Sequence, residues 1–216
     1  MLEQLEKYSE EAIIDHVLKG EKALYEIIVR RFNPYLYKIG RSYNYNHEDT
    51  QDLMQDTFVD AYKNLAQFKG RSSFKTWIIR IMLSNCYRKS KKSSFNNEIM
   101  QDVNDKAKPI FSSGNNDTSK LVQNRELGHI IENALAKISE DYRMVFSLRE
   151  VIGLTVSETA DLLQLSPGNV KVRLNRAKKM LRNEIEKSYA PEELFEFNLI
   201  YCDVMVENVM KRINEL

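Results

Sequence analysis

The chain predicts an all-α fold: two small helical domains joined by a flexible linker, followed by a C-terminal amphipathic helix. Three observations predict it. Only 7 glycines and 4 prolines occur among 216 residues, so few positions interrupt a helix. Apolar side chains recur at helical spacing through most of the chain. The stretch 93–123 differs, because it is rich in Ser, Asn and Asp and has few clustered apolar residues, which is typical of a linker.

The first predicted domain, residues 1–92, contains five helices. They are expected at about 10–18, 22–31, 35–43, 49–65 and 74–89. Pro34 lies between the second helix and the third, and the residue before a proline is disfavoured in a helix. Asp49 is the expected N-cap of the fourth helix. The loop 69–73 interrupts the apolar pattern, and the fifth helix follows it.

The second predicted domain, residues 124–187, ends in a helix-turn-helix. Helices are expected at about 125–138 and 140–151, before two short helices joined by a tight turn. Ser166 is a good N-cap and Pro167 suits the first helical position, so the last helix starts sharply. Its buried stripe is Val170, Leu174, Ala177 and Leu181.

The opposite face of that last helix is cationic. No acid occurs between Ser166 and Arg182. The cations are Lys171, Arg173, Arg176, Lys178, Lys179 and Arg182. A helix of this kind offers Arg and Lys to a DNA groove. The alternative is a packed helix pair with a solvated cationic face, although solvated faces usually mix both signs of charge.

A second cationic block lies near the middle of the chain. Net charge is only +1, so the distribution of charge carries the argument. Residues 70–92 hold seven cations and no acid, and Phe74, Trp77 and Tyr87 are interleaved with them. Charge for phosphates combined with aromatic surfaces for unstacked bases is what single-stranded nucleic acid requires. The alternative is that Phe74 and Trp77 are core residues.

An acidic stripe precedes this block. Asp52, Asp56 and Asp60 recur every four residues on the fourth helix, where like charges cost about 0.2–0.5 kcal/mol per pair. No lysine on that helix precedes Lys63 to offset them. The stripe indicates a basic protein partner, and the alternative is a solvated acidic face.

Catalysis has no support in the sequence. The two cysteines and three histidines are scattered, and neither a glycine-rich phosphate loop nor a nucleophile elbow occurs. The acidic stripe spreads over about 12 Å, too far for all three carboxylates to bind one metal ion. We therefore expect no catalytic residues, no metal and no cofactor. Without a signal peptide or a long apolar run, the chain is expected in the cytoplasm with no membrane insertion.

Two runs resemble a known family. His47–Phe68 together with Phe74–Asn85 resembles region 2 of the extracytoplasmic-function (ECF) sigma factors of the sigma-70 family. Leu135–Glu150, with the helix-turn-helix after it, resembles their region 4. The resemblance covers about Lys22 to Arg182. It implies a region 2 domain at 1–92, a linker at 93–123, a region 4 domain at 124–187 and an added C-terminal helical extension at 188–216.

The resemblance also implies partners and site residues. The chain would bind core RNA polymerase and promoter DNA, both as duplex and as melted single strand, and an anti-sigma factor or other regulator would be a further partner. Core polymerase would contact Asp52, Gln55, Asp56 and Asp60. The −10 element would contact Arg71, Ser72, Ser73, Lys75, Trp77, Arg80 and Arg88. The −35 element would contact Arg149, Ser166, Asn169, Lys171, Arg173, Arg176 and Lys178.

The length of the linker bears on how two promoter elements are reached. Elements about 20 base pairs apart are separated by about 70 Å. About thirty residues reach roughly 100 Å when extended but average only about 30 Å as a coil. The linker can span the gap without setting it, so core polymerase is expected to hold the domains apart. The alternative function is a stand-alone helix-turn-helix regulator, which would need neither the cationic block nor the acidic stripe.

The C-terminal extension carries an apolar stripe at helical spacing after an expected helix start at 191–193. The stripe is Phe195, Leu199, Cys202, Val206, Val209 and Ile213. From Glu184 onward there are eight acids and three bases, a net charge of −5. Two readings stay open. The stripe packs onto the second domain and completes it, or it docks reversibly on a basic surface or a regulator and restrains the protein.

Overall fold

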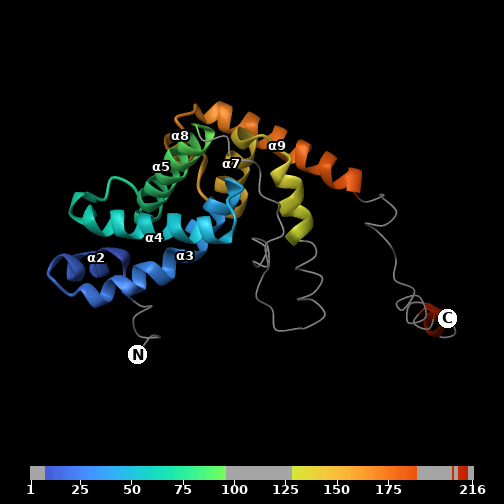
Figure 1. Ribbon diagram of the computed structural model, residues 1–216. Helices are drawn as coiled ribbons and strands as arrows, with labels where there is room; N and C mark the ends of the chain where they lie inside the picture. The colour runs from blue at the N-terminus through green and yellow to red at the C-terminus, as the bar shows by residue number, and fades with distance from the viewer. Residues whose placement is uncertain (1–7, 96–127, 189–205, 207–208, 214–216) are drawn as a thin grey trace.

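The computed structural model describes residues 8–95, 128–188, 206 and 209–213, and no strand occurs among them (Figure 1). The first helical group contains α2 (Glu10–Leu18), η1 (Lys22–Leu24), α3 (Tyr25–Ser42), α4 (His47–Lys63), η2 (Leu65–Gln67) and α5 (Phe74–Phe95). The second contains residues 128–136, which are helical, and α7 (Glu140–Phe146), η3 (Ser147–Val151), α8 (Val156–Leu163) and α9 (Pro167–Ser188). The all-α prediction is confirmed, whereas the predicted linker and domain boundaries fall largely outside the described residues.

Helix α3 corrects the expected break at Pro34. The two predicted helices, 22–31 and 35–43, are one helix that contains Pro34 in its interior. A proline there removes a backbone hydrogen bond and costs about 3 kcal/mol. The apolar stripe Ile28, Phe32, Leu36 and Ile39 continues in phase across Pro34 and is at most 2% exposed. Burial of these four side chains outweighs the cost, because each contributes about 1.5–3 kcal/mol.

Helix α4 also starts earlier than predicted. Its N-cap is Asn46, whose side-chain oxygen accepts a hydrogen bond from the Asp49 backbone N–H at 2.8 Å. Asp49, the predicted cap, therefore lies in the first turn, where its negative charge still favours the helix N-terminus. Helices α3, α4 and α5 pack against one another, and Phe58, Ala61 and Leu65 in this group are buried.

The second group forms the predicted helix-turn-helix. Thr155 caps α8 in a capping box with Glu158, and Gln164 ends that helix in the left-handed conformation at φ 53°. Ser166 then caps α9, accepting from the Asn169 N–H at 3.2 Å. The predicted helix at 140–151 is α7 followed by five residues of π-helix.

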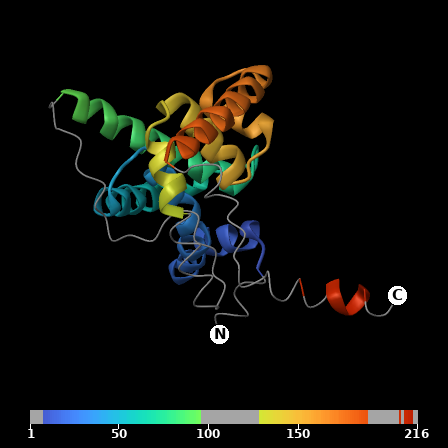
Figure 2. The same ribbon diagram turned by 90° about the vertical axis from the view of Figure 1, so that its right-hand side faces the viewer.

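The two groups are in contact with each other (Figures 1 and 2). Buried residues of the second group join the core cluster built by α2, α3, α4 and α5. They are Met144, Leu148, Ile152 and Leu154. Each is at most 4% exposed. The sequence did not indicate this shared core, because each domain shows a complete helical pattern by itself.

The C-terminal extension is described only at 206 and 209–213. There the predicted stripe residues Val206, Val209 and Ile213 are each about half exposed, and in both views these residues stand apart from the other helices (Figures 1 and 2). The helix start at 191–193 and the other stripe residues lie outside the described residues. No helix within the described part of the chain is both long and apolar enough to cross a bilayer.

Candidate nucleic-acid interface

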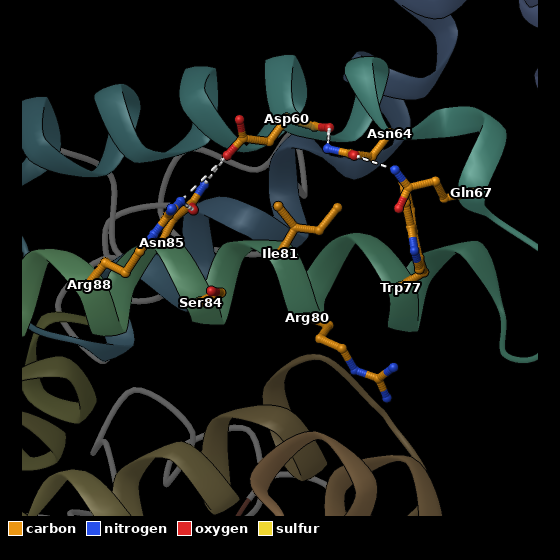
Figure 3. A pocket seen from close by; sticks show the side chains of 9 residues that line it. All are labelled: Asp60, Asn64, Gln67, Trp77, Arg80, Ile81, Ser84, Asn85 and Arg88. Atoms are coloured by element: carbon orange, nitrogen blue, oxygen red, sulfur yellow. Dashed lines mark hydrogen bonds and ion pairs between the residues drawn. The ribbon is translucent and has the colours of Figure 1, made fainter.

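A polar groove runs between α4 and α5. One pocket of about 430 Å³ lies in it, and Figure 3 shows its lining. The lining residues are Asp60, Asn64, Gln67, Trp77, Arg80, Ile81, Ser84, Asn85 and Arg88. A neighbouring pocket of about 450 Å³ is lined by Asp52, Leu53, Asp56, Asn85, Arg88, Lys89 and Lys92. The groove thus has an acidic wall from α4 and a basic wall from α5.

Pairs across the groove neutralise part of the acidic stripe. The Asp60 carboxylate accepts a hydrogen bond from the Asn85 side-chain amide at 3.3 Å and lies 3.6 Å from the Arg88 guanidinium (Figure 3). Lys89 forms an ion pair with Asp49 one turn before the stripe. These cations come from α5, so no pattern within α4 could reveal them. The Asp60 carboxylate is therefore already paired with side chains of α5 within this groove.

The N-terminal part of the acidic stripe is exposed. Asp52, Gln55 and Asp56 are all exposed on α4. Asp52 and Asp56 have no salt-bridge partner among the described residues. The stripe thus separates into an exposed N-terminal part and an internally paired end at Asp60.

The loop before α5 holds three of the predicted −10 residues. Gly70 has φ +67°, which favours glycine, and Arg71 beside it is exposed. Ser73 caps the helix, because its hydroxyl accepts from the Thr76 N–H at 3.1 Å. The Ser72 hydroxyl donates to the Ser73 carbonyl at 3.3 Å. Ser73 thus has a structural role, and Arg71 is the side chain that the loop presents.

The Trp77 ring is partly packed in the protein and partly exposed in the pocket, so it fits in part both alternatives that the sequence left open, a core residue and a surface for unstacked bases. Its ring lies 5.5 Å from the Phe68 ring and 5.3 Å from the Phe74 ring, so much of it is packed. It nevertheless lines the pocket beneath Gln67 (Figure 3). Phe74 is 1% exposed and belongs to the core. Tyr87, in contrast, is 56% exposed on the same helix.

Lys75 and Arg80 lie on the side of α5 that faces the second helical group. The Lys75 ammonium donates to the Ile152 carbonyl at 2.7 Å and lies 4.1 Å from the Tyr35 ring centroid. Burial lowers the pKa of Lys75. The Thr76 hydroxyl donates to the Glu158 carboxylate at 2.7 Å, and Arg80 follows one turn later on that face. Arg80 is exposed and points away from α4 (Figure 3).

The α9 face carries the second cationic surface. Val170 and Ala177 are fully buried beneath it, as the sequence predicted. Ion pairs engage three of its cations: Arg173 lies 3.3 Å from Asp141, Lys178 lies 3.0 Å from Glu150, and Arg182 lies 3.1 Å from Glu186. Figure 2 shows α9 along the outer edge of the second helical group.

Two other cations of α9, Lys171 and Arg176, form none of these ion pairs. Lys171 and Arg176 are both exposed. Arg176 makes only a long contact of 3.4 Å to the Tyr142 hydroxyl, which is beyond the usual hydrogen-bond range. Lys171 and Arg176 are therefore exposed cations without a close partner among the described residues.

Arg149 and Val172 stand out among the residues of this surface. Arg149 is half-buried, and its Nε atom is buried without a hydrogen-bond partner among the described residues. Val172 is 47% exposed on α9. The sequence reasoning missed Val172 because it followed only the buried stripe and the charges.

The described residues contain no candidate metal site. No group of three or more His, Cys, Asp or Glu side chains that could hold a metal ion occurs in the part of the chain that the structure describes.

Comparison with known families decides the identity. The family model "Sigma-70 region 2" matches residues 28–95, and "Sigma-70, region 4" matches residues 128–181. Together the two models cover more than half of the chain, in the order found here. The chain belongs to the sigma-70 family. Region 2 contains the groove between α4 and α5, and region 4 contains the helix-turn-helix.

Curated relatives are ECF sigma factors. The ECF RNA polymerase sigma-E factor of Haemophilus influenzae is 25% identical over 190 residues, which are 84% of this chain and 97% of that protein. The sigma-E factor of Escherichia coli K12 is 26% identical over 186 residues, with 84% and 96% covered. The matches extend over nearly the whole length of both relatives and place the chain in the ECF group.

Solved structures share the fold. CnrH, solved in complex with the cytosolic domain of CnrY, matches with a TM-score of 0.58 and 20% identity over 82% of this chain and 97% of CnrH. The sigma factor RpoE from Bartonella quintana, solved with the anti-sigma factor NepR, matches with a TM-score of 0.57 and 22% identity over 79% and 98%.

Proposed function

We propose that the chain binds core RNA polymerase, reads a −35 element with α9 and a −10 element with α5, and melts the DNA at the second. Membership of the sigma-70 family makes it an initiation factor that directs promoter-specific transcription. The single observation that carries the two-site assignment is the presence of two separate cationic surfaces in the order region 2, region 4. The factor works as a binding subunit in the cytoplasm and performs no catalytic step itself.

Core polymerase would bind the exposed part of the acidic stripe. Asp52, Gln55 and Asp56 offer carboxylates and an amide on one face of α4. An exposed acidic face gains from a basic partner both affinity and rate of association. Asp60 contributes indirectly, because its contacts with Asn85 and Arg88 hold α4 against α5.

The −10 strand would lie along α5. Arg71 is exposed and would bind a phosphate, and Arg88, which is also exposed, would first have to exchange Asp60 for DNA. The pocket of about 430 Å³ suits an unstacked base, since the Asn64 and Gln67 side chains offer amides and Trp77 offers part of its ring. Stacking on an aromatic ring contributes about 1–3 kcal/mol per base.

The −35 duplex would meet the N-terminal half of α9. Lys171 and Arg176 are exposed there, and Ser166 and Asn169 stand at the helix start, where recognition helices contact base edges. Arg149, which is half-buried, would contact a backbone phosphate. Arg173 and Lys178 would first have to exchange Asp141 and Glu150 for DNA.

Transcription with bacterial core polymerase tests the function. Start sites are mapped on fragmented genomic DNA with core alone, with core plus the chain, and with core plus the Lys171→Glu, Arg176→Glu double variant. The complete chain should create start sites that share two upstream elements, and the double variant should lose them. A stand-alone regulator would bind DNA without creating any start site.

An inhibitor of the anti-sigma class is a further partner that we propose. The support is the Bartonella structural relative, which was solved with one. Co-purification of the chain from its own cells tests this, because an inhibitor should leave the complex when core polymerase is added.

A further inference from the structure

Val172 lies on the face of α9 that is turned away from the protein core. At 100° per residue it lies about 200° around the helix from Val170, which is fully buried. It is 47% exposed. Its neighbours one turn away on the same face are Gly168, Asn169 and Arg176, and all three are exposed. The side chain therefore contributes little to the core of its own domain.

Stability gives no reason for a valine at this place. Val is a weaker helix former than Ala or Lys, because its branched side chain loses rotamer freedom in a helix. The rest of this outer face is polar or cationic. An apolar side chain placed there suits a partner with a small apolar group among many polar ones.

The major groove of DNA has such a partner. Thymine presents a methyl group there, beside hydrogen-bonding groups of the neighbouring bases. Asn169 precedes Val172 by three residues and Arg176 follows by four, so all three side chains project from one side of α9. An amide pairs best with adenine and a guanidinium with guanine. We propose that Val172 reads the methyl group of a thymine in the −35 element, and this inference rests on the proposed function.

Uracil provides the test, since it lacks only that methyl group. Holoenzyme with wild-type chain, Val172→Ala or Met180→Ala is titrated with −35 duplexes in which each thymine is replaced singly by uracil. Wild type should lose about fourfold in affinity at one position, the value for one buried methylene-sized group. Holoenzyme with Val172→Ala should bind the duplex with uracil at that position as tightly as the duplex with thymine. Met180, 38% exposed farther along α9, is the matched control and should keep the wild-type sensitivity.

Either of two results would overturn this assignment. One is a wild-type holoenzyme insensitive to every uracil, or a −35 element without thymine. The other is a Val172→Ala variant that still distinguishes thymine from uracil. Failure of the proposed function itself looks different, because then no start site appears on any template.

Discussion

Removal of the Arg143 side chain on α7 should strongly destabilise region 4. The guanidinium is 6% exposed and donates to four carbonyl groups. Two of these bonds are short, 2.5 Å to Ser42 and 2.7 Å to Ile138, and two are long, 3.3 Å to Leu135 and Ala136. Burial lowers the pKa of this guanidinium, which nevertheless stays charged at neutral pH.

The magnitude follows from the short bonds. A hydrogen bond to a charged group contributes about 1.5–3 kcal/mol, so the two give about 3–6 kcal/mol, and water that enters the space left by Arg143→Ala offsets part of this. We expect a loss of about 3–4 kcal/mol in the free energy of unfolding. A domain of this size has a total stability of about 3–9 kcal/mol, so the variant should be close to unfolding.

Urea unfolding of the full-length chain measures the loss. Far-ultraviolet circular dichroism follows both domains, and fluorescence of Trp77, the single tryptophan, follows region 2. Arg143→Ala should shift the transition seen by dichroism further than the one seen by fluorescence. Arg149→Ala is the matched control on the following π-helix, and it should change stability by less than Arg143→Ala does, because Arg149 is only half-buried. A loss below about 1 kcal/mol for Arg143→Ala would refute the reasoning.

Three further predictions concern charge, reactivity and pH. The double variant Asp52→Lys, Asp56→Lys should weaken binding to core polymerase at least tenfold in a pull-down titration. The control variant Glu11→Lys, which changes an exposed acid on α2, should bind like wild type. Equal binding of wild type, control and double variant would show that α4 is not the contact. Burial raises the pKa of the Cys86 thiol to about 12, so in a Cys202→Ser chain at pH 8 alkylation should be slow when folded and fast in denaturant; rapid alkylation of the folded chain would contradict its burial. Hydrogen bonding from the Thr155 N–H holds the pKa of Glu158 below 4.5, so the stability that its carboxylate adds is present above pH 4.5 and lost as pH falls through the folded value. The advantage of wild type over Glu158→Gln in thermal unfolding should therefore be constant from pH 7 to pH 5 and shrink below pH 4.5, and an advantage unchanged at pH 3 would be inconsistent with it.

The helices themselves could be predicted from local patterns. The stripe of α9 and the cap at Ser166 follow from spacing and residue type, and both are confirmed. The predicted helix break at Pro34 was wrong, because burial of apolar side chains along α3 outweighs the unfavourable effect of a proline inside a helix. The cap of α4 was placed three residues late for a similar reason: Asn46 and Asp49 are both good caps, and only the backbone path selects Asn46.

The candidate site, like the helices, could be predicted from the sequence only in part. The sequence identified the acidic stripe, the cationic block and the helix-turn-helix, since each lies on one continuous segment. It could not show that Asp60 is held by Asn85 and Arg88, because that network joins two helices. The exposure of Val172 was also hidden, since an isolated valine in a helical pattern is usually a core residue.

By itself the sequence determined which segments are helices, where their charges lie and which family they belong to, because periodicity, capping and motif order are properties of short stretches. Only the tertiary structure decided which of those charges are free. Lys75 donates to Ile152 and Arg173 pairs with Asp141, whereas Asp52, Asp56 and Lys171 remain exposed. The physical reason is distance: a hydrogen bond or an ion pair depends on separations of about 3–4 Å between atoms far apart in the chain.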